Sequence, residues 1–222
     1  MLQQQSQFFR KNNGVFLQHY RGFCCQIYGM NDIELIDQVR KGNMNAFTFL
    51  VNRYQKLVVH IVGRLIQRQD VLEDVCQDVF LKVYQHLGKY RRESKLSTWI
   101  AAIAYNTGIN YVRKMGNERE MEPDDAAVLQ NLADFRGDSY EREDLHRYLR
   151  EQIELLPVHY RTVLTLFHLE EFSSLEIEQI TGMPEGTVKS YLFRAKALLK
   201  EKLKWIVDAN SLKEVKEIVH EN

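Results

Sequence analysis

The sequence is poor in the residues that break helices. It holds 3 prolines and 11 glycines in 222 residues, whereas hydrophobic residues make up 45%. A chain of this kind can bury a substantial core, and stretches rich in Leu, Ile, Glu, Lys and Gln favour helices over a turn-rich β architecture. The composition therefore predicts an all-α fold, with room for two small domains.

Cysteine is also scarce. The 3 cysteines, Cys24, Cys25 and Cys76, show no CxxC spacing and no histidine in a ligand register. This pattern argues against a disulfide framework and a zinc site, so we expect no metal and no cofactor. A glycine-rich phosphate loop and a nucleophile with a placed base are missing as well. We therefore expect that the protein is not an enzyme.

No apolar run reaches the roughly 18 uncharged residues that a membrane span needs. The N-terminus also lacks a compact hydrophobic stretch followed by a small-residue cleavage site. We therefore expect no membrane insertion and a cytoplasmic location.

Net charge is absent overall but not locally. The chain balances 30 Lys and Arg against 30 Asp and Glu. Residues 30–115 hold 13 basic against 8 acidic side chains, residues 116–144 hold 3 against 10, and residues 184–204 hold 6 against 2. Two basic modules flanking an acidic connector are compatible with binding phosphate at two places.

Composition and periodicity divide the chain into five parts. Residues 1–29 lack a sustained period and are predicted to be a poorly ordered extension. Two helical domains, 30–115 and 138–204, are joined by an acidic linker, 116–137, with a short helical piece around 126–133, and 205–222 form a tail.

Capping signals and apolar steps of three and four place the helices. Asn31 and Glu34 have capping-box spacing, Ser97 or Thr98 can cap the third long helix, and Asp138 or Glu141 can cap the first helix of the second domain. The predicted helices of the first domain span about 31–42, 46–65, 70–87 and 97–114. In the second domain, one predicted helix precedes Pro157 and another follows it.

The segment 173–204 carries the strongest local signal, a helix-turn-helix. Ser173 and Glu176 have capping-box spacing, Gly182 suits a left-handed turn, and Pro184 suits a first helical turn. On the second helix, an inward stripe about 80° wide is expected to be the core face. This stripe consists of Val188, Leu192, Ala195, Leu199 and Leu203.

The outer face of that helix suits the major groove of duplex DNA. Arg194 can pair with guanine, the hydroxyls of Thr187 and Ser190 can meet bases or phosphates, and Phe193 can meet a thymine methyl. Lys189, Lys196, Lys200 and Lys202 would add phosphate contacts. The alternative is a solvated amphipathic helix, which would leave the turn, the basic surplus and the exposed Phe193 unexplained.

A second stripe of interest, about 60° wide, lies on the third long helix. It is separate from the side on which Ile100, Ile103, Ala104, Thr107 and Tyr111 cluster. An indole, two amides and a guanidinium suit unstacked bases, and neighbouring cations can follow a single strand. A half-buried Trp edge with solvated Asn is the competing interpretation. The stripe consists of Trp99, Asn106, Asn110 and Arg113, flanked by Lys95 and Lys114.

Three motifs carry a family resemblance. Residues 70–80 read DVLEDVCQDVF, residues 97–106 read STWIAAIAYN, and LPVHYR at 156–161 is followed by GTVKS at 186–190 and by Arg194-Ala195. Together they resemble the extracytoplasmic-function (ECF) sigma factors of bacterial RNA polymerase, a branch of the sigma-70 family, over nearly all of residues 31–204.

The resemblance implies a sigma2-like helical bundle, a sigma4-like helix-turn-helix domain and a non-enzymatic subunit that directs promoter-specific initiation. Implied partners are core RNA polymerase, through its beta-prime clamp and beta flap, promoter DNA and an anti-sigma factor. By position, the clamp would meet Asp70, Glu73, Asp74, Gln77 and Asp78. The melted −10 element would meet Lys95, Trp99, Asn106, Asn110, Arg113 and Lys114; the −35 duplex would meet Thr187, Lys189, Ser190, Phe193, Arg194 and Lys196.

Three residues depart from the family pattern. Asn110 stands where an Asp is common, Glu178 where the helix-turn-helix usually packs an Ala, and Tyr191 where an Arg often follows the Ser. A charge at a helix crossing is costly unless it reaches solvent, so Glu178 predicts helices set slightly apart. Tyr191 is expected to remove one phosphate contact.

Two alternative functions account for part of the chain. A helix-turn-helix regulator that binds a duplex operator explains 173–204 but not 70–114. A helical adaptor that binds a protein partner explains the basic helices alone.

Overall fold

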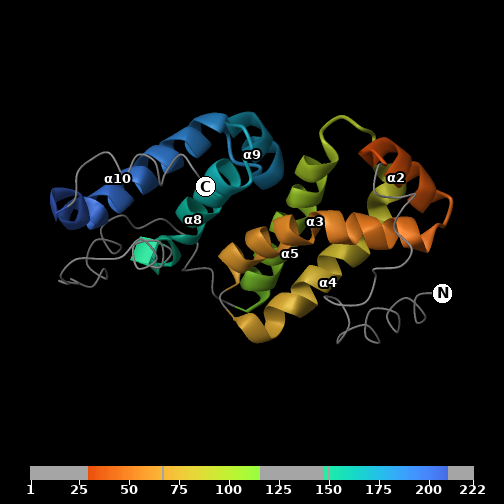
Figure 1. Cartoon of the computed structure of the whole chain (residues 1–222), viewed down its shortest axis with the longest axis horizontal. Helices are drawn as coiled ribbons and strands as arrows, with labels where there is room; N and C mark the ends of the chain where they lie inside the picture. Colours follow the sequence, from red (N-terminus) through yellow and green to blue (C-terminus); the bar gives the residue numbers. More distant parts are fainter. Residues whose placement is uncertain (1–29, 67, 116–147, 150, 210–222) are drawn as a thin grey trace.

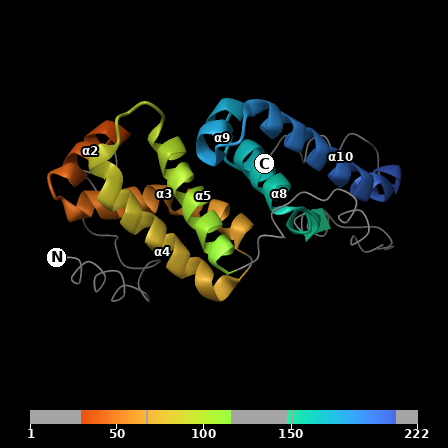
Figure 2. The same cartoon turned by 180° about the vertical axis from the view of Figure 1, so that it is seen from behind.

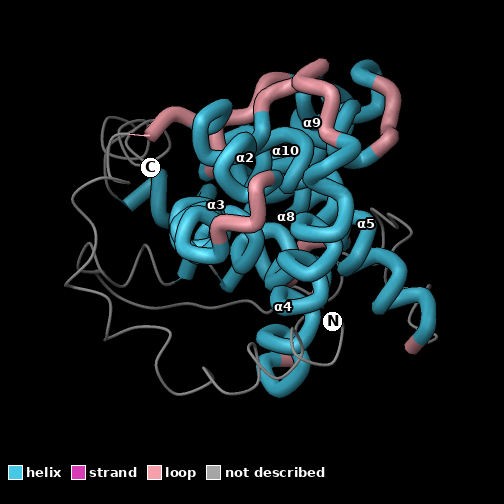
Figure 3. The backbone as a smooth tube through the Cα atoms, turned by 90° about the vertical axis from the view of Figure 1, so that its right-hand side faces the viewer, coloured by secondary structure: helices cyan, strands magenta, loops and turns pink. Residues whose placement is uncertain are grey.

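The computed structural model describes residues 30–66, 68–115, 148–149 and 151–209, leaving aside the side chains of residues 69 and 202–209. These residues form helices joined by short loops and contain no strand, which confirms the all-α prediction (Figures 1 and 3). No helix among them is long and apolar enough to cross a membrane. The predicted extension at 1–29, the helical piece at 126–133 and the caps at Asp138 and Glu141 lie outside the described residues.

The first group of helices is a bundle around α3. Asn31 and Glu34 form the predicted capping box at the start of α2, and Asn43 caps α3. Apolar side chains of α3, α4 and α5 interlock over the length of the bundle, with Leu50, Val58, Val79 and Ile100 fully buried. The elements are α2 (Asp32–Arg40), α3 (Met44–Leu65), α4 (Gln69–His86), the short η1 (Leu87–Lys89) and α5 (Leu96–Lys114).

The start of α5 differs from the sequence prediction. The helix begins at Leu96 with Lys95 as its N-cap residue, and no side chain caps it. Ser97 and Thr98 are therefore inside the helix, and Thr98 is only 2% exposed. Burial of this helical turn against its neighbours outweighs the preference of hydroxyl side chains for the cap position.

The second group of helices comes from the C-terminal part of the chain. After a helical stretch at 151–154, Pro157 precedes α8 (Val158–Leu164), which continues into a wider π-helical turn, η3 (Thr165–Leu169). Then come α9 (Ser174–Thr181) and α10 (Glu185–Ala209). Because α10 runs past Lys204, it extends into the segment that the sequence assigned to a tail.

The turn between α9 and α10 is built as the sequence predicts. Ser173 and Glu176 form the capping box of α9, and Gly182 ends that helix with a φ of 74°, in the left-handed region that glycine tolerates best. Val188, Leu192 and Ala195 are buried against α8 and α9, which confirms the inward stripe as far as side chains are described.

Replacing Ser173 with alanine is expected to lower the free energy of unfolding by about 1 kcal/mol, because the Glu176 amide loses its acceptor. Urea unfolding followed by circular dichroism measures the effect. Ser174→Ala is the matched control, since Ser174 is the first residue inside the helix and does not cap it. Equal stability of the two variants would contradict the capping role.

The two groups of helices pack against each other. Helix α9 lies along α5, and α8 with η3 lies against α3 (Figures 1 and 2). Buried apolar side chains from both groups form one continuous cluster. The sequence predicted two domains joined by a linker but not this shared face.

Candidate nucleic-acid interface

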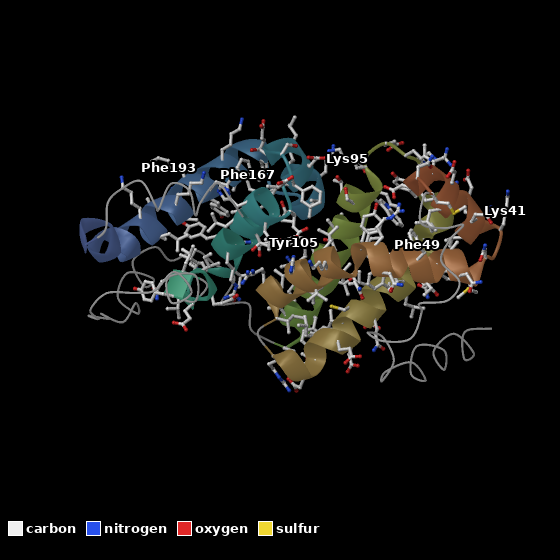
Figure 4. All side chains as sticks on the ribbon, viewed as in Figure 1. Lys41, Phe49, Lys95, Tyr105, Phe167 and Phe193 are labelled. Carbon is white, nitrogen blue, oxygen red and sulfur yellow. The ribbon has the colours of Figure 1, made fainter. Side chains whose placement is uncertain are left out.

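The outer face of α10 presents the residues that the sequence assigned to duplex DNA. Phe193 is 76% exposed, the largest value among the exposed large hydrophobic side chains of the described residues, and Arg194 beside it is exposed. Figure 4 shows Phe193 on α10, away from the α2–α5 bundle. Thr187 and Ser190 are half-buried, and the Ser190 hydroxyl donates to the Thr187 carbonyl at 2.9 Å. The exposed Phe193 ring is unfavourable in water, and an apolar ring beside a guanidinium suits contacts with base edges in a groove.

Two of the predicted cations are engaged within the chain. Lys189 Nζ lies 2.8 Å from Glu185 Oε1, one helical turn earlier, and stays largely exposed. Lys196 Nζ lies 5.6 Å from the ring centroid of Phe167, a cation–π contact with η3. Lys196 is thus turned toward its own domain, whereas Lys189 can exchange an exposed, weakly held partner for a phosphate.

Tyr191 does not lie on the outer face. Its ring meets Tyr160 edge-on, with centroids 5.2 Å apart, and lies near His159. Burial lowers the pKa of His159, so the imidazole is kept neutral in this cluster. Tyr191 therefore packs between α10 and α8, and the expected loss of a phosphate contact at this position stays a prediction.

Glu178 on α9 remains partly exposed, so its carboxylate reaches solvent at the edge of the helix-turn-helix. This is the arrangement that lowers the cost of a charge near a helix crossing.

Helix α5 presents the predicted single-strand stripe to solvent. Asn106, Asn110 and Arg113 are exposed, and Lys114 continues the stripe at the end of the helix. The Asn106 amide donates to the Ala102 carbonyl at 2.9 Å, which leaves its oxygen directed away from that bond. An exposed row of two amides and two cations offers acceptors and donors to base edges and positive charge to phosphates.

Trp99 is only half-buried. Its ring lies 5.2 Å from that of Tyr90, tilted by 46°, so one part of the indole packs on the bundle. The remaining part can stack on a base, and the contact with Tyr90 holds the indole in position before any base binds. The packed edge is therefore observed, while the stacking platform stays a prediction.

A third face of α5 was missed by the sequence reasoning. Thr98, Tyr105 and Ile109 are buried on the side that meets α9 and its neighbours, and burial raises the pKa of Tyr105 to about 12. Tyr191 of α10 lies close enough to contribute to that shift. Two apolar faces on one helix are the signal that could have indicated a second packing partner.

The outer face of α4 is acidic. Glu73, Asp74 and Asp78 are exposed and Gln77 is half-buried, with its amide donating to Glu73 at 3.3 Å. Asp70 opens the face and pairs with Arg68, which holds the pKa of the Asp70 carboxyl below its usual range. The inner face of the same helix holds Cys76, whose thiol pKa burial raises to about 12, as expected of an unreactive apolar position.

The helix-turn-helix of α9 and α10, on an all-helical fold, defines the class of helical DNA-binding proteins. The chain matches the family models of sigma-70 region 2, over residues 50–118, and sigma-70 region 4, over residues 146–199. It belongs to the ECF sigma factors of RNA polymerase, as its relatives also show. As a sigma factor, it acts in promoter-directed initiation of transcription.

Relatives of established name cover most of the chain. The ECF RNA polymerase sigma-E factor of Haemophilus influenzae is 34% identical over 185 residues, which are 78% of this chain and 96% of that protein. The sigma-E factor of Escherichia coli K12 is 33% identical over 80% of this chain and 97% of its own length. The sigma-H factor of Pseudomonas aeruginosa is 30% identical over 78% of this chain and 93% of its own length.

Solved structures agree on the fold. CnrH in complex with the cytosolic domain of CnrY is similar with a TM-score of 0.54 and 20% identity, over 81% of this chain and 99% of that one. The sigma factor RpoE in complex with the anti-sigma factor NepR from Bartonella quintana is similar with a TM-score of 0.52 and 23% identity. The match covers 71% of this chain and 96% of that one.

Proposed function

We propose that three separate surfaces of this sigma factor divide the work of initiation. The acidic face of α4 binds the beta-prime clamp of core RNA polymerase. The stripe of Trp99, Asn106, Asn110 and Arg113, with Lys95 and Lys114, holds unpaired bases of the −10 element. The outer face of α10, with Thr187, Lys189, Ser190, Phe193 and Arg194, reads the −35 duplex, and its domain meets the beta flap. Lys196 is left out, because it faces Phe167.

The observation that carries the proposal is the coexistence of these surfaces on different helices of one chain. Each contains exposed side chains, and each has the chemistry of its proposed ligand: carboxylates for a basic protein surface, an indole with amides for bases, and a guanidinium beside an aromatic ring for a major groove. An operator-binding regulator would account for α10 alone, and a protein adaptor would not need the Trp99 stripe.

The remaining roles follow from the family. The protein is a binding subunit whose polymerase partner performs the chemistry, and it works where the polymerase and chromosome are, in the bacterial cytoplasm. We add an anti-sigma factor as a partner, because the second of the similar solved structures is such a complex.

Replacing Asp74 with asparagine is expected to weaken binding to core polymerase about 2- to 5-fold, mostly through a slower association, because one exposed charge at an interface edge steers encounter more than it adds affinity. Surface plasmon resonance with immobilised core polymerase, at two salt concentrations, measures both rates. Glu151→Gln is the control, since it removes an exposed charge from the other group of helices. An unchanged association rate at low salt would remove Asp74 from the polymerase surface.

A further inference from the structure

The first turn of α10 carries a carboxylate in an otherwise basic stretch. Glu185 is the first residue of the helix, and up to Lys200 it is the only acidic one. The same stretch contains Lys189, Arg194, Lys196 and Lys200. The N-terminal residues of a recognition helix are the ones that contact base edges. The proposed reading helix therefore has a negative charge at the end that meets the bases.

The residue after Glu185 leaves space at this end of the helix. Gly186 is exposed, and in the described part of the chain a Cβ added there would meet nothing within 4 Å outside the helix backbone and the two neighbouring residues. Its φ is not positive, so neither internal packing nor the backbone requires a glycine. Glycine lowers helix stability relative to alanine and is used where a ligand approaches the backbone closely. Gly186 thus supports a close approach of DNA to the start of α10.

Lys189 neutralises Glu185 in the free chain. Its Nζ lies 2.8 Å from Glu185 Oε1, and the two side chains are 63% and 35% exposed, respectively. An exposed ion pair between residues i and i+4 is weak, because water competes for both charges. When Lys189 turns to a phosphate, the Glu185 carboxylate is left without its cation. Since helical side chains point toward the N-terminus, this carboxylate then extends past the first turn of α10.

A carboxylate in the major groove distinguishes the base edges. It only accepts hydrogen bonds, so guanine O6 and N7 and thymine O4, which are also acceptors, repel it. The amino groups of cytosine and adenine can donate to it, but adenine presents its N7 acceptor beside the amino group. Cytosine N4 is therefore the base group that a carboxylate prefers, and the other edges are disfavoured by repulsion.

We propose that Glu185 is a specificity-determining residue of the −35 contact. With Lys189 turned to a phosphate, the Glu185 carboxylate accepts a hydrogen bond from N4 of a cytosine at one position of the element. The inference rests on the proposed function of the outer face of α10. It adds to that face a residue that rejects wrong bases by repulsion, whereas Arg194 selects by attraction.

A purely structural role for Glu185 predicts a different result. A negative charge in the first turn is favoured by the helix dipole, and the pair with Lys189 adds a little to helix stability. Loss of that role would change stability and leave the base preferences as they are. Base preference is therefore the measurement that separates the two roles.

Fluorescence anisotropy with the full-length chain measures this preference. The duplexes come from a promoter identified by mapping transcript starts, with each base pair of the −35 element varied in turn. We expect the wild-type chain to prefer cytosine at one position about 5- to 20-fold, and the Glu185→Gln variant to retain about 2-fold or less, because an amide both donates and accepts. The variant should also bind a scrambled duplex about 2- to 5-fold more tightly, since a charge that repels phosphates is removed.

Glu201→Gln is the matched control. It removes the same charge from an exposed position of the same helix, about 24 Å further along the axis, and should leave every base preference unchanged. A second comparison uses a Lys189→Gln background. There Glu185→Gln should still remove the cytosine preference, because the carboxylate contacts the base itself.

Identical base preferences of the wild-type chain and Glu185→Gln would overturn the inference and leave the rest of the reading face intact. Loss of the Glu185→Gln effect in the Lys189→Gln background would also overturn it, because Glu185 would then act only through the lysine. A wild-type chain that binds the promoter duplex and the scrambled duplex alike would contradict the proposed −35 contact itself, so the two failures are distinguishable.

Discussion

A Trp99→Ala variant is expected to bind the −35 duplex normally and to open the promoter poorly. Stacking of one base on an aromatic side chain contributes about 1–3 kcal/mol, so the opening equilibrium should fall about 5- to 150-fold. Fluorescence of 2-aminopurine placed in the −10 element, with reconstituted polymerase, reports opening, and anisotropy of a −35 duplex reports the other contact.

The Tyr90 contact requires a control for folding, because removing the indole also removes packing at the start of α5. Trp99→Phe keeps an aromatic ring in that position and should recover part of the promoter opening. Thermal unfolding of both variants shows how much of the lost opening comes from lost stability. Normal opening by a folded Trp99→Ala variant would remove this residue from the melted element.

The second large effect is expected at Arg194. Replacing it with alanine should lower affinity for the −35 duplex by about 1–3 kcal/mol, if its guanidinium makes a bidentate contact with a base. Lysine at this position should not restore specificity, because a single ammonium lacks the planar pair of donors. Competition binding with the cognate duplex and a scrambled duplex measures both affinity and specificity.

Lys56→Ala is a suitable control for charge alone, since Lys56 is an exposed cation on α3, far in sequence from the helix-turn-helix. If the Arg194→Ala and Lys56→Ala variants bind the cognate duplex alike, the assignment of the reading face on α10 is wrong.

Much of this fold could be predicted from the sequence because helical periodicity and capping are local. The capping boxes at Asn31 and Ser173, the turn at Gly182 and the inward stripe of α10 each depend on residues within a few positions of one another. The exposed stripe on α5 could be predicted for the same reason: a period of 3.6 residues fixes which side chains share a face.

The rest depends on contacts between distant segments. Tyr191 lies at the edge of the inward stripe, and the rings of Tyr160 and His159 decide its direction. Lys196 is drawn to Phe167 for a similar reason. The spacing of residues along α10 cannot predict either contact, because the partner rings lie on α8 and η3.

The burial of Thr98 and Tyr105 has the same origin. Periodicity marks them as one face of α5, but only the second group of helices, about 70 residues later, covers that face. The packing of the two groups of helices against each other is therefore the least predictable feature of the structure.

The most direct test of function is reconstituted transcription with purified core polymerase and a promoter identified by mapping transcript starts after overexpression of this chain. We expect specific initiation only when the chain is added, and its loss when Trp99 and Arg194 are both replaced with alanine. A chain that binds the duplex yet leaves initiation by core polymerase unchanged would contradict the assignment as the polymerase specificity subunit.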